Sequence, residues 1–167
     1  MSCVDKGFSP YISLLISGLT VVFDQVIKWQ TQQSIAYGDS ISLTPFFNWV
    51  HTWNTGAAFG LLSNGGGWQR YFFIGVALLM SVALTRLIFN KVSKRDGISY
   101  GLILGGAVGN LIDRLFRGYV VDSLHLGWQT WQLPVFNIAD IAITLGVILL
   151  LLSNLQVSMI PNLPGSK

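Results

Sequence analysis

The sequence predicts an all-α membrane protein with four transmembrane helices and a small β-platform outside the membrane. Three observations lead to this prediction. Hydrophobic residues make up 51% of the 167 residues, and the mean hydropathy is +0.57. Charged residues make up only 10%, whereas a soluble domain carries about 25%. Four stretches of the chain approach the roughly 20 mostly apolar residues that a helix needs to cross the hydrocarbon core.

The same composition excludes several other classes of protein. So few charges cannot cover the surface of a soluble protein, and intrinsic disorder requires low hydrophobicity with high charge. The net charge of +3 is too small and too scattered for nucleic-acid binding, so we expect no nucleic-acid partner. The single cysteine, Cys3, rules out an intramolecular disulfide and a cysteine-based zinc cluster.

The expected helices follow from the placement of the few charges. No charge falls within Gly7–Phe23 and no small-x-small cleavage site follows it, so the first span is expected to be a retained anchor. Tyr71–Thr85 becomes long enough if Arg86 extends its side chain toward the headgroups. Ile98–Ile112 is uncharged, and Asp140 is the only charge in the fourth span. We expect a single integral-membrane domain, 1–167, with spans at about residues 10–29, 70–90, 98–115 and 136–157.

Four spans place both termini on the same side of the membrane. That side carries six of the ten Lys and Arg residues, including the cluster in the short loop Lys91–Arg95. The positive-inside rule therefore predicts cytoplasmic termini. Five of the seven aspartates fall on the opposite side or at its membrane edge: Asp24, Asp39, Asp113, Asp122 and Asp140.

Two long segments also lie on this outer side. Gln30–Gln69 is rich in aromatic residues and β-formers between Ile41 and Trp53, which favours a small sheet or interfacial platform. The second segment, Phe116–Val135, contains Trp128 and Trp131, and tryptophan is enriched in the headgroup zone.

Asp122 and Asp140 are the principal candidate site residues, because an ionisable residue at a membrane is costly. Singly, Asp122 could pair with Arg114 or Arg117, and Asp140 could cap the helix dipole of the fourth span. Together they lie on one side, 18 positions apart. Two neighbouring carboxylates share one proton, so the neutral acid can polarise a carbonyl while the ionised partner takes a proton from water. Such a pair could hydrolyse an amide without a metal or a covalent intermediate.

Other catalytic machinery is weakly indicated. His51 and His125 lack zinc-ligand spacing. The GxSxG string Gly97–Gly101 opens the third span on the cytoplasmic side, away from both histidines, and is interpreted as a chance match.

Asp24 and Lys28 have the i,i+4 spacing of a helical ion pair, which could anchor the first span or act directly.

The third span carries a further set of motif residues. Gly101, Gly105 and Gly109 form one smooth stripe, which lets a neighbouring helix approach closely. Asn110 follows directly and is expected to hydrogen-bond to another helix or to extended backbone. Asp113 and Arg114 are adjacent, so their side chains point apart and are expected to have different partners. A second small-residue segment, Asn54–Gly60, could form a tight turn or a clamp on a substrate backbone.

Five motifs in order carry a resemblance to a known family. They are Asp24-Gln25 with Lys28, Asn54–Phe59, Gly105–Arg114, Val120–Asp122 and Phe136–Asp140. In these motifs, in length and in number of spans, the chain resembles the bacterial lipoprotein signal peptidases (type II signal peptidases). The motifs differ from the usual family pattern at Ser123, where an aromatic residue is common, and at Ile27, where Ser or Thr is common.

The resemblance implies a membrane-embedded aspartic endopeptidase of the bacterial inner membrane. Such an enzyme removes the signal peptide from diacylglyceryl-modified prolipoproteins, cutting before the lipidated cysteine. Nothing visible in the sequence requires a cofactor or a metal. Its implied catalytic residues are Asp122 and Asp140. Residues implied to bind substrate or support the site are Asn54, Gly56, Asn110, Arg114, Asn137 and Ala139, and residues with a more structural role are Asp24, Lys28 and Asp113.

The resemblance also implies a fold and a placement in the membrane. Four helices carry a small periplasmic β-cradle, which matches Ile41–Phe59, and the active site lies toward the periplasmic face. The expected partners are lipid-modified prolipoproteins and membrane lipid, and the expected oligomeric state is a monomer.

The alternative is a small proton- or cation-coupled transporter subunit that uses the paired aspartates. The clustering of the aspartates at one face, and the lack of a half-repeat, argue against it. A purely structural membrane subunit would leave the cost of five outer-side aspartates unexplained.

Overall fold

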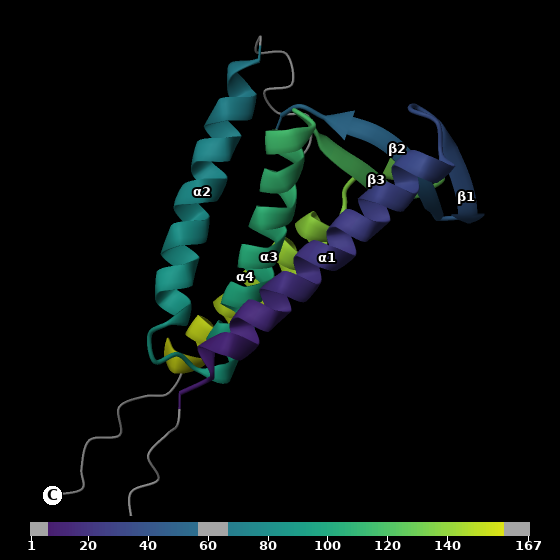
Figure 1. Ribbon diagram of the computed structural model, residues 1–167. Coiled ribbons are helices and arrows are strands. Elements are labelled where there is room, and N and C mark those ends of the chain that lie inside the picture. The colour runs from purple at the N-terminus through teal and green to yellow at the C-terminus, as the bar shows by residue number, and fades with distance from the viewer. Residues whose placement is uncertain (1–6, 57–66, 159–167) are drawn as a thin grey trace, which may run out of the picture.

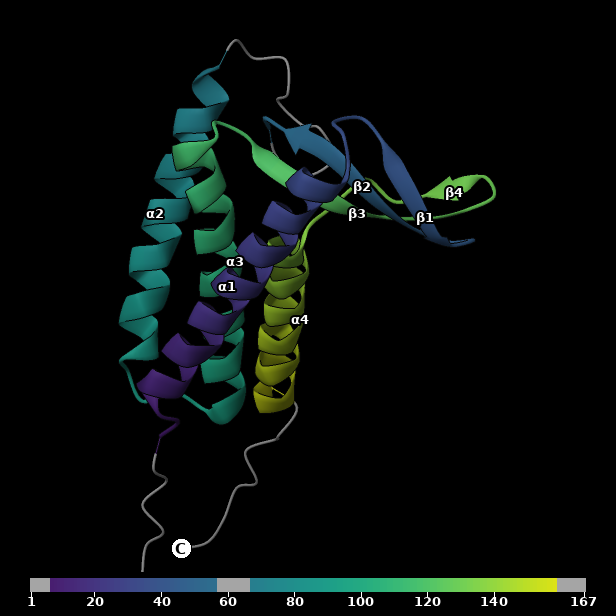
Figure 2. The same ribbon diagram turned by 45° about the vertical axis from the view of Figure 1, so that its right-hand side comes forward.

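The computed structural model describes residues 7–56 and 67–158, in which four long helices form a bundle with a small antiparallel sheet at one end (Figure 1, Figure 2). The first turn of α1 and the last turn of α4 lie together at the end of the bundle opposite the sheet. The elements in chain order are α1 (Pro10–Ser34), β1 (Ser40–Thr44), β2 (Phe47–Asn54), α2 (Trp68–Ile88), α3 (Lys94–Phe116), β3 (Val120–Trp128), β4 (Trp131–Gln132) and α4 (Ile138–Ser158).

Local sequence signals set the ends of the helices. Pro10 occupies the first turn of α1, where its missing N–H costs no hydrogen bond. Ser93 is the N-cap of α3, because its Oγ accepts the backbone N–H of Asp96 at 3.2 Å; the same hydroxyl donates to the Asp96 carboxylate at 2.9 Å. Gly118, with φ of +87°, supplies the left-handed residue that turns the chain out of α3.

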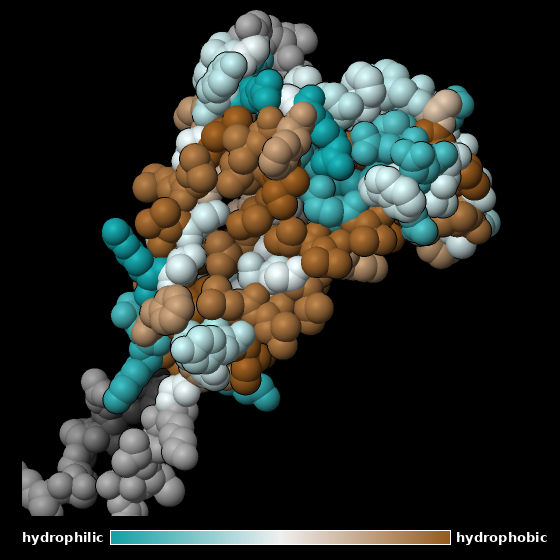
Figure 3. Space-filling model, in the orientation of Figure 1, coloured by the Kyte–Doolittle hydropathy of each residue, from teal (hydrophilic) through white to brown (hydrophobic). Residues whose placement is uncertain are grey.

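Three of the helices within the described residues, α1, α2 and α4, are long and apolar enough to cross a membrane. Large apolar side chains on them are exposed, such as Tyr11 at 74%, Leu15 at 60% and Leu79 at 70%. Figure 3 shows apolar side chains covering the helices between polar groups at the sheet and at the opposite end. Since soluble proteins rarely expose such continuous apolar surface, this is a membrane protein.

The third expected span, α3, is not apolar enough to count as a candidate span. It begins with Lys94, Arg95 and Asp96 and holds many glycines. The physical reason is its central position: α3 packs against α1, α2 and α4, so its buried faces need small residues and partners for polar groups more than they need lipid-compatible side chains.

The glycine stripe of α3 lies against α1. A Cβ atom on Gly101 would lie 2.6 Å from the backbone oxygen of Ser13, and one on Gly105 would lie 2.8 Å from that of Ser17. No real side chain is tolerated at such distances without movement, so the stripe allows the two backbones to approach. The expectation that these glycines serve close helix packing is confirmed.

The sheet has the antiparallel order β1-β2-β3-β4. The prediction of strands between Ile41 and Trp53 is confirmed by β1 and β2. The sequence did not predict β3, which it placed in a segment of the headgroup zone. β3 pairs with β2 across about 70 residues of chain, with Thr52 opposite Asp122, and such a non-local pairing leaves no local signal. The part of the Asn54–Phe59 motif beyond Gly56 lies outside the described residues.

The first helix is also longer than expected, ending at Ser34 rather than near Trp29. The additional turn is held by Thr31, whose Oγ accepts a hydrogen bond of 2.8 Å from the indole Nε1 of Trp49 in β2. This contact joins the last turns of α1 to β2.

Candidate active site

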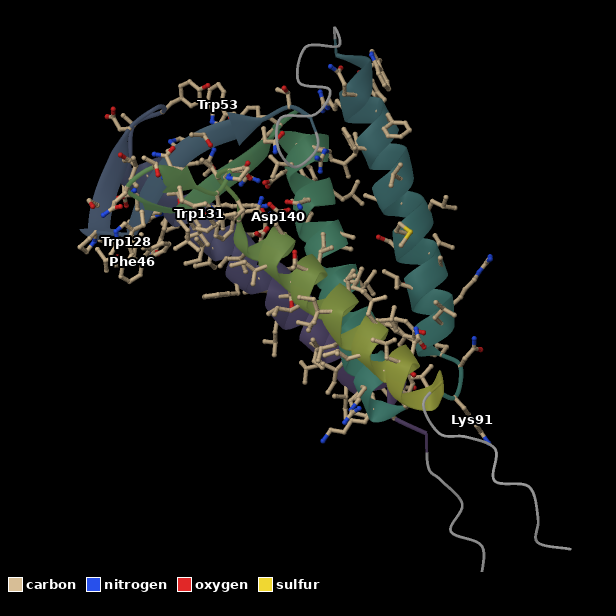
Figure 4. The ribbon with its side chains drawn as sticks, turned by 180° about the vertical axis from the view of Figure 1, so that it is seen from behind. Phe46, Trp53, Lys91, Trp128, Trp131 and Asp140 are labelled. Carbon is tan, nitrogen blue, oxygen red and sulfur yellow. The ribbon has the colours of Figure 1, made fainter. Side chains whose placement is uncertain are left out.

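Asp122 and Asp140 meet where the sheet covers the bundle. Asp122 lies on β3, and Asp140 lies in the first turn of α4, beneath the sheet (Figure 4). Asn137 links them: its Nδ2 donates to Asp122 Oδ1 at 2.7 Å, and its backbone N–H donates to Asp140 Oδ2 at 3.3 Å. The backbone N–H of Asp140 in turn donates to Asn137 Oδ1 at 3.0 Å. Two residues that are 18 positions apart therefore share one buried amide.

The contacts of Asn137 also explain how α4 begins. The reciprocal bonds between Asn137 and Asp140 form a capping box that satisfies backbone donors at the helix N-terminus. The interpretation that Asp140 caps the fourth helix is thus confirmed. The same bonds orient its carboxylate toward Asn110, whose Nδ2 donates to Asp140 Oδ1 at 2.9 Å.

Asp122 is more deeply buried than its partner, with 4% of its surface exposed. Besides the bond from Asn137, its Oδ2 accepts a bond of 3.3 Å from Asn54 Nδ2. Burial, and to a lesser extent the negative charge of Asp140, raise the pKa of Asp122 from 3.8 to about 7. The two amide bonds favour the charged form and act in the opposite direction. One proton is therefore readily held at this site near neutral pH.

Neither arginine proposed as a partner for Asp122 takes that place. Arg117 pairs with Asp113 one turn earlier in the chain. Arg114 donates to the backbone oxygen of Gly56 at 2.9 Å and lies 4.9 Å from the ring centroid of Phe73. The prediction that Asp113 and Arg114 serve different partners is confirmed.

Asn54 and Gly56 form a tight turn beside Asp122. The Oδ1 atom of Asn54 accepts the backbone N–H of Gly56 at 3.0 Å, which is the local bond typical of asparagine turns. Arg114 holds the other side of this turn through the Gly56 carbonyl. The turn interpretation of this segment is confirmed for its described residues, and the turn places the Asn54 side chain next to Asp122.

The i,i+4 pair on α1 is confirmed and belongs to a larger buried network. Lys28 Nζ lies 2.7 Å from Asp24 Oδ2 and 2.9 Å from Asp113 Oδ2, with side-chain exposures of 1% or less. Gln25, to which the sequence assigned no role of its own, donates to Asp113 and accepts from Arg117. The pair is not a surface ion pair at the edge of the bundle, because Asp24, Lys28 and Asp113 are fully buried.

Comparison with known proteins decides the family. A family model described as "Signal peptidase (SPase) II" matches residues 16–156. The chain belongs to the signal peptidase II family. Two similar proteins named lipoprotein signal peptidase come from Serratia marcescens, 59% identical over 155 residues, covering 93% of this chain and 91% of the relative, and from Acinetobacter baumannii, 48% identical over 143 residues, covering 84% and 81%.

Solved structures agree with this assignment. One bacterial membrane enzyme determined at 2.3 Å resolution has a TM-score of 0.85 and 31% identity, covering 97% of this chain and 98% of its own. A second, at 1.9 Å, has a TM-score of 0.76 and 33% identity, covering 90% and 96%. The resemblance inferred from the five motifs is confirmed, and the transporter alternative gains no support.

In this member of the signal peptidase II family, a cavity of about 570 Å³ opens beside Asp140. Its polar residues include Asn54 and Asp140, and its other walls are mostly apolar side chains: Leu133, Pro134, Val135, Phe136, Ile141, Ile143 and Leu145. The cavity can therefore hold an apolar group next to a carboxylate.

Ala139 is the remaining predicted site residue of this family member, and the structure explains its size. It is fully buried, and its carbonyl lies where a Cβ on Gly106 would be. A Cβ on Gly109 would lie 3.4 Å from the Ala139 Cβ. Small residues on both helices thus let α4 begin against α3, which brings Asp140 to Asn110.

Two features from the sequence do not belong to the site. Ser99 of the GxSxG string donates to the backbone oxygen of Arg95 at the opposite end of α3. His51 contacts the backbone oxygen of Ile35 at 2.8 Å and accepts from Trp53.

The sequence did not predict a role for Arg70. Its guanidinium donates to the Arg114 and Leu115 carbonyls at 2.8 and 2.9 Å, at the end of α3. The available signal was its charge at the start of α2.

Proposed function

We propose that this membrane protein is an aspartic endopeptidase that removes the signal peptide from diacylglyceryl-modified prolipoproteins, cutting before the lipidated cysteine. Its family membership and its relatives, which are named lipoprotein signal peptidases, support the substrate class. The observation that carries the aspartic mechanism is the sharing of Asn137 by Asp122 and Asp140. Two carboxylates from separate elements then face one site with a shared proton.

We assign the proton to Asp122 and the negative charge to Asp140. Asp122 is buried, and its pKa of about 7 keeps it largely protonated below neutral pH. Asp140 lies at the N-terminus of α4, where the helix dipole favours an anion, and it accepts bonds from Asn110 and from the backbone of Asn137. These donors support a carboxylate rather than a carboxylic acid.

In the proposed reaction Asp140 removes a proton from water, and the water oxygen bonds to the scissile carbonyl carbon. Asp122 gives its proton to the carbonyl oxygen, which forms a tetrahedral diol. Asp140 then gives its proton to the leaving nitrogen as the C–N bond breaks, and Asp122 recovers a proton from a hydroxyl of the diol. Both carboxyl groups end in their starting states, so no cofactor is consumed.

The surrounding groups suit an extended, lipid-modified substrate. The Asn54–Gly56 turn, Arg114 and Asn137 present polar groups that could hold the peptide backbone next to Asp122 and Asp140. The apolar cavity beside Asp140 could take an apolar side chain of the signal peptide or part of an acyl chain. We propose that the substrate reaches it laterally from the bilayer.

We further propose that α3 also crosses the membrane, which gives four spans in a single integral-membrane domain, 1–167, that acts as a monomer in the bacterial inner membrane. The termini are cytoplasmic and the site faces the periplasm. The basic loop Lys91–Arg95 lies at the end opposite the sheet (Figure 4), in agreement with the positive-inside rule. Trp128 and Trp131, exposed at 63% and 60% on the sheet, suit the periplasmic headgroup zone.

The test is a mass assay with purified protein in detergent, a diacylglyceryl-modified prolipoprotein, the unlipidated precursor as control, and EDTA present. Asp122→Asn and Asp140→Asn should each reduce cleavage at least about 100-fold while the protein stays folded. Asp39→Asn, an exposed aspartate on the same side, is the matched control and should retain activity. Cleavage retained by either site variant would refute the paired-carboxylate mechanism.

A further inference from the structure

Two buried aspartates outside the catalytic pair each hold the backbone next to a catalytic aspartate. Asp24 Oδ1 accepts the backbone N–H of Ala139 at 2.9 Å, and Ala139 immediately precedes Asp140. Asp113 Oδ2 accepts the backbone N–H of Val121 at 3.1 Å, and Val121 immediately precedes Asp122. A carboxylate of α1 thus holds the start of α4, and a carboxylate of α3 holds the start of β3.

Lys28 joins these two carboxylates. Its Nζ lies 2.7 Å from Asp24 Oδ2 and 2.9 Å from Asp113 Oδ2, and it donates to Asn110 Oδ1 at 3.1 Å. An ammonium group has three N–H donors, and three acceptors surround this one. Lys28 is fully buried, so water cannot substitute for a lost partner.

The third bond of Lys28 reaches the catalytic pair by a different route. By holding Asn110 Oδ1, the ammonium group sets which end of the amide faces α4. The Nδ2 end then donates to Asp140 Oδ1 at 2.9 Å. If the amide were reversed, its oxygen would face the Asp140 carboxylate, and a favourable bond would become a repulsion.

Charge balance explains how three charged side chains, Lys28, Asp24 and Asp113, can be fully buried. The network holds two carboxylates, Asp24 and Asp113, and two cations, Lys28 and Arg117. Each carboxylate has at least one cation in contact, which offsets the cost of burying charge. Removal of Lys28 alone would leave one negative charge in excess, so Asp24 and Asp113 would repel each other and their hold on α4 and β3 would loosen.

We propose that Lys28 is a positioning residue that sets the relative placement of Asp122 and Asp140 through Asp24, Asp113 and Asn110. The inference rests on the proposed function, since it concerns the geometry of that reaction. A purely structural lysine would neutralise buried charge and stabilise the fold, whereas a positioning lysine also controls turnover. Misplacement of a reacting group by about 1 Å can cost about 100-fold in rate.

The two roles are separated by a variant that restores charge balance without the lysine. Lys28→Met is expected to lower the melting temperature, because it buries an uncompensated charge. In Lys28→Met combined with Asp24→Asn the remaining pair, Asp113 with Arg117, is neutral, and the melting temperature should recover most of the loss. Asn at position 24 can still accept a hydrogen bond through its side-chain oxygen.

The readout is cleavage of the lipidated precursor, with kcat and KM determined below the melting temperature of each variant. For the charge-balanced double variant we expect kcat to fall at least about 10-fold while KM changes less than about threefold. The control is Thr31→Val, at a position three residues after Lys28 in α1. It removes the acceptor for the Trp49 indole, so it should lower the melting temperature and leave kcat unchanged.

The outcomes distinguish this inference from the proposed function. A double variant with kcat within about threefold of the starting protein would overturn the positioning role, as would a fall in kcat no larger than that of a control of equal stability. If the unmodified protein cleaves no lipidated precursor, or if Asp122→Asn and Asp140→Asn remain active, the proposed function itself fails. Cleavage that depends on both aspartates but survives loss of Lys28 refutes only the positioning role.

Discussion

Replacement of Asp122 by asparagine should change how the stability of the protein depends on pH. Asp122 has a pKa of about 7 in the folded protein and 3.8 as an isolated group. Between these values the folded state keeps a proton that the unfolded state has released. The free energy of unfolding therefore falls as pH rises, by about 1.4 kcal/mol per pH unit.

The size of the effect follows from the interval between the two values. About three pH units at this slope give a loss of about 4 kcal/mol between pH 4 and pH 7. Between pH 5 and pH 7 the loss is about 3 kcal/mol. For a protein of this length 1 kcal/mol corresponds to about 2–4 °C in melting temperature, so the melting temperature should fall by about 6–11 °C over this interval. Asparagine does not titrate, so Asp122→Asn should lack this contribution.

The assay is thermal melting of both proteins in the same detergent from pH 4.5 to pH 8. Asn54 and Asn137 both donate to Asp122. In Asp122→Asn one of these two donors would meet the new side-chain NH₂ group instead of an acceptor oxygen, and the lost hydrogen bond costs about 1–3 kcal/mol. That cost is independent of pH, and the slope is the informative quantity. The two curves should converge or cross as pH rises to 7, and should run parallel above it.

Parallel curves over the whole range would refute the argument, because they would mean that Asp122 titrates alike in the folded and unfolded states. A second variant checks the cause. Asp140→Asn removes the neighbouring negative charge but leaves the burial of Asp122 intact, so the midpoint of the Asp122 titration should move below 7 without returning to 3.8. The same titration predicts that cleavage by the unmodified protein declines above about pH 7, as Asp122 loses its proton.

Three further predictions concern packing and positioning. Gly105→Ala should destabilise the protein by about 1–3 kcal/mol, since its Cβ would lie 2.8 Å from the Ser17 carbonyl, whereas Gly75→Ala, with no atom within 4 Å, should not; thermal melting of the pair compares them. Arg70→Met should lower stability by about 2–3 kcal/mol, because two carbonyls at the end of α3 lose a charged donor; unchanged melting would contradict this. Asn137→Ala should reduce kcat about 100-fold, because it removes the side-chain donor to Asp122 Oδ1 and the acceptor for the backbone N–H of Asp140, and the mass assay with lipidated precursor would detect it.

Much of the site could be recognised in the sequence because its residues stand out locally. A carboxylate in an apolar run, such as Asp122 or Asp140, is costly wherever it falls near a membrane. The pair Asp24 and Lys28 could be predicted because helix geometry alone brings i and i+4 together, and the glycine stripe of α3 could be predicted from the same periodicity. The helices followed from runs of apolar residues, which need no knowledge of their neighbours.

The tertiary structure decided what depends on contacts between distant parts of the chain. Strand β3 forms because β2 pairs with it, with Thr52 opposite Asp122. Its composition alone predicted only a segment of the headgroup zone. Lys28 meets Asn110 from 82 positions away, and Asp24 meets Ala139 from 115. Such contacts are set by the packing of α1, α3 and α4.

The sequence by itself therefore determined the membrane class, the family and the identity of the chemically unusual residues, since these follow from residue type and local spacing. Only the tertiary structure decided that one amide, Asn137, joins both aspartates and that one ammonium group, Lys28, holds the elements that carry them. A buried hydrogen bond requires both partners at about 3 Å, and no local pattern in a sequence specifies the distance between two segments that meet only after folding.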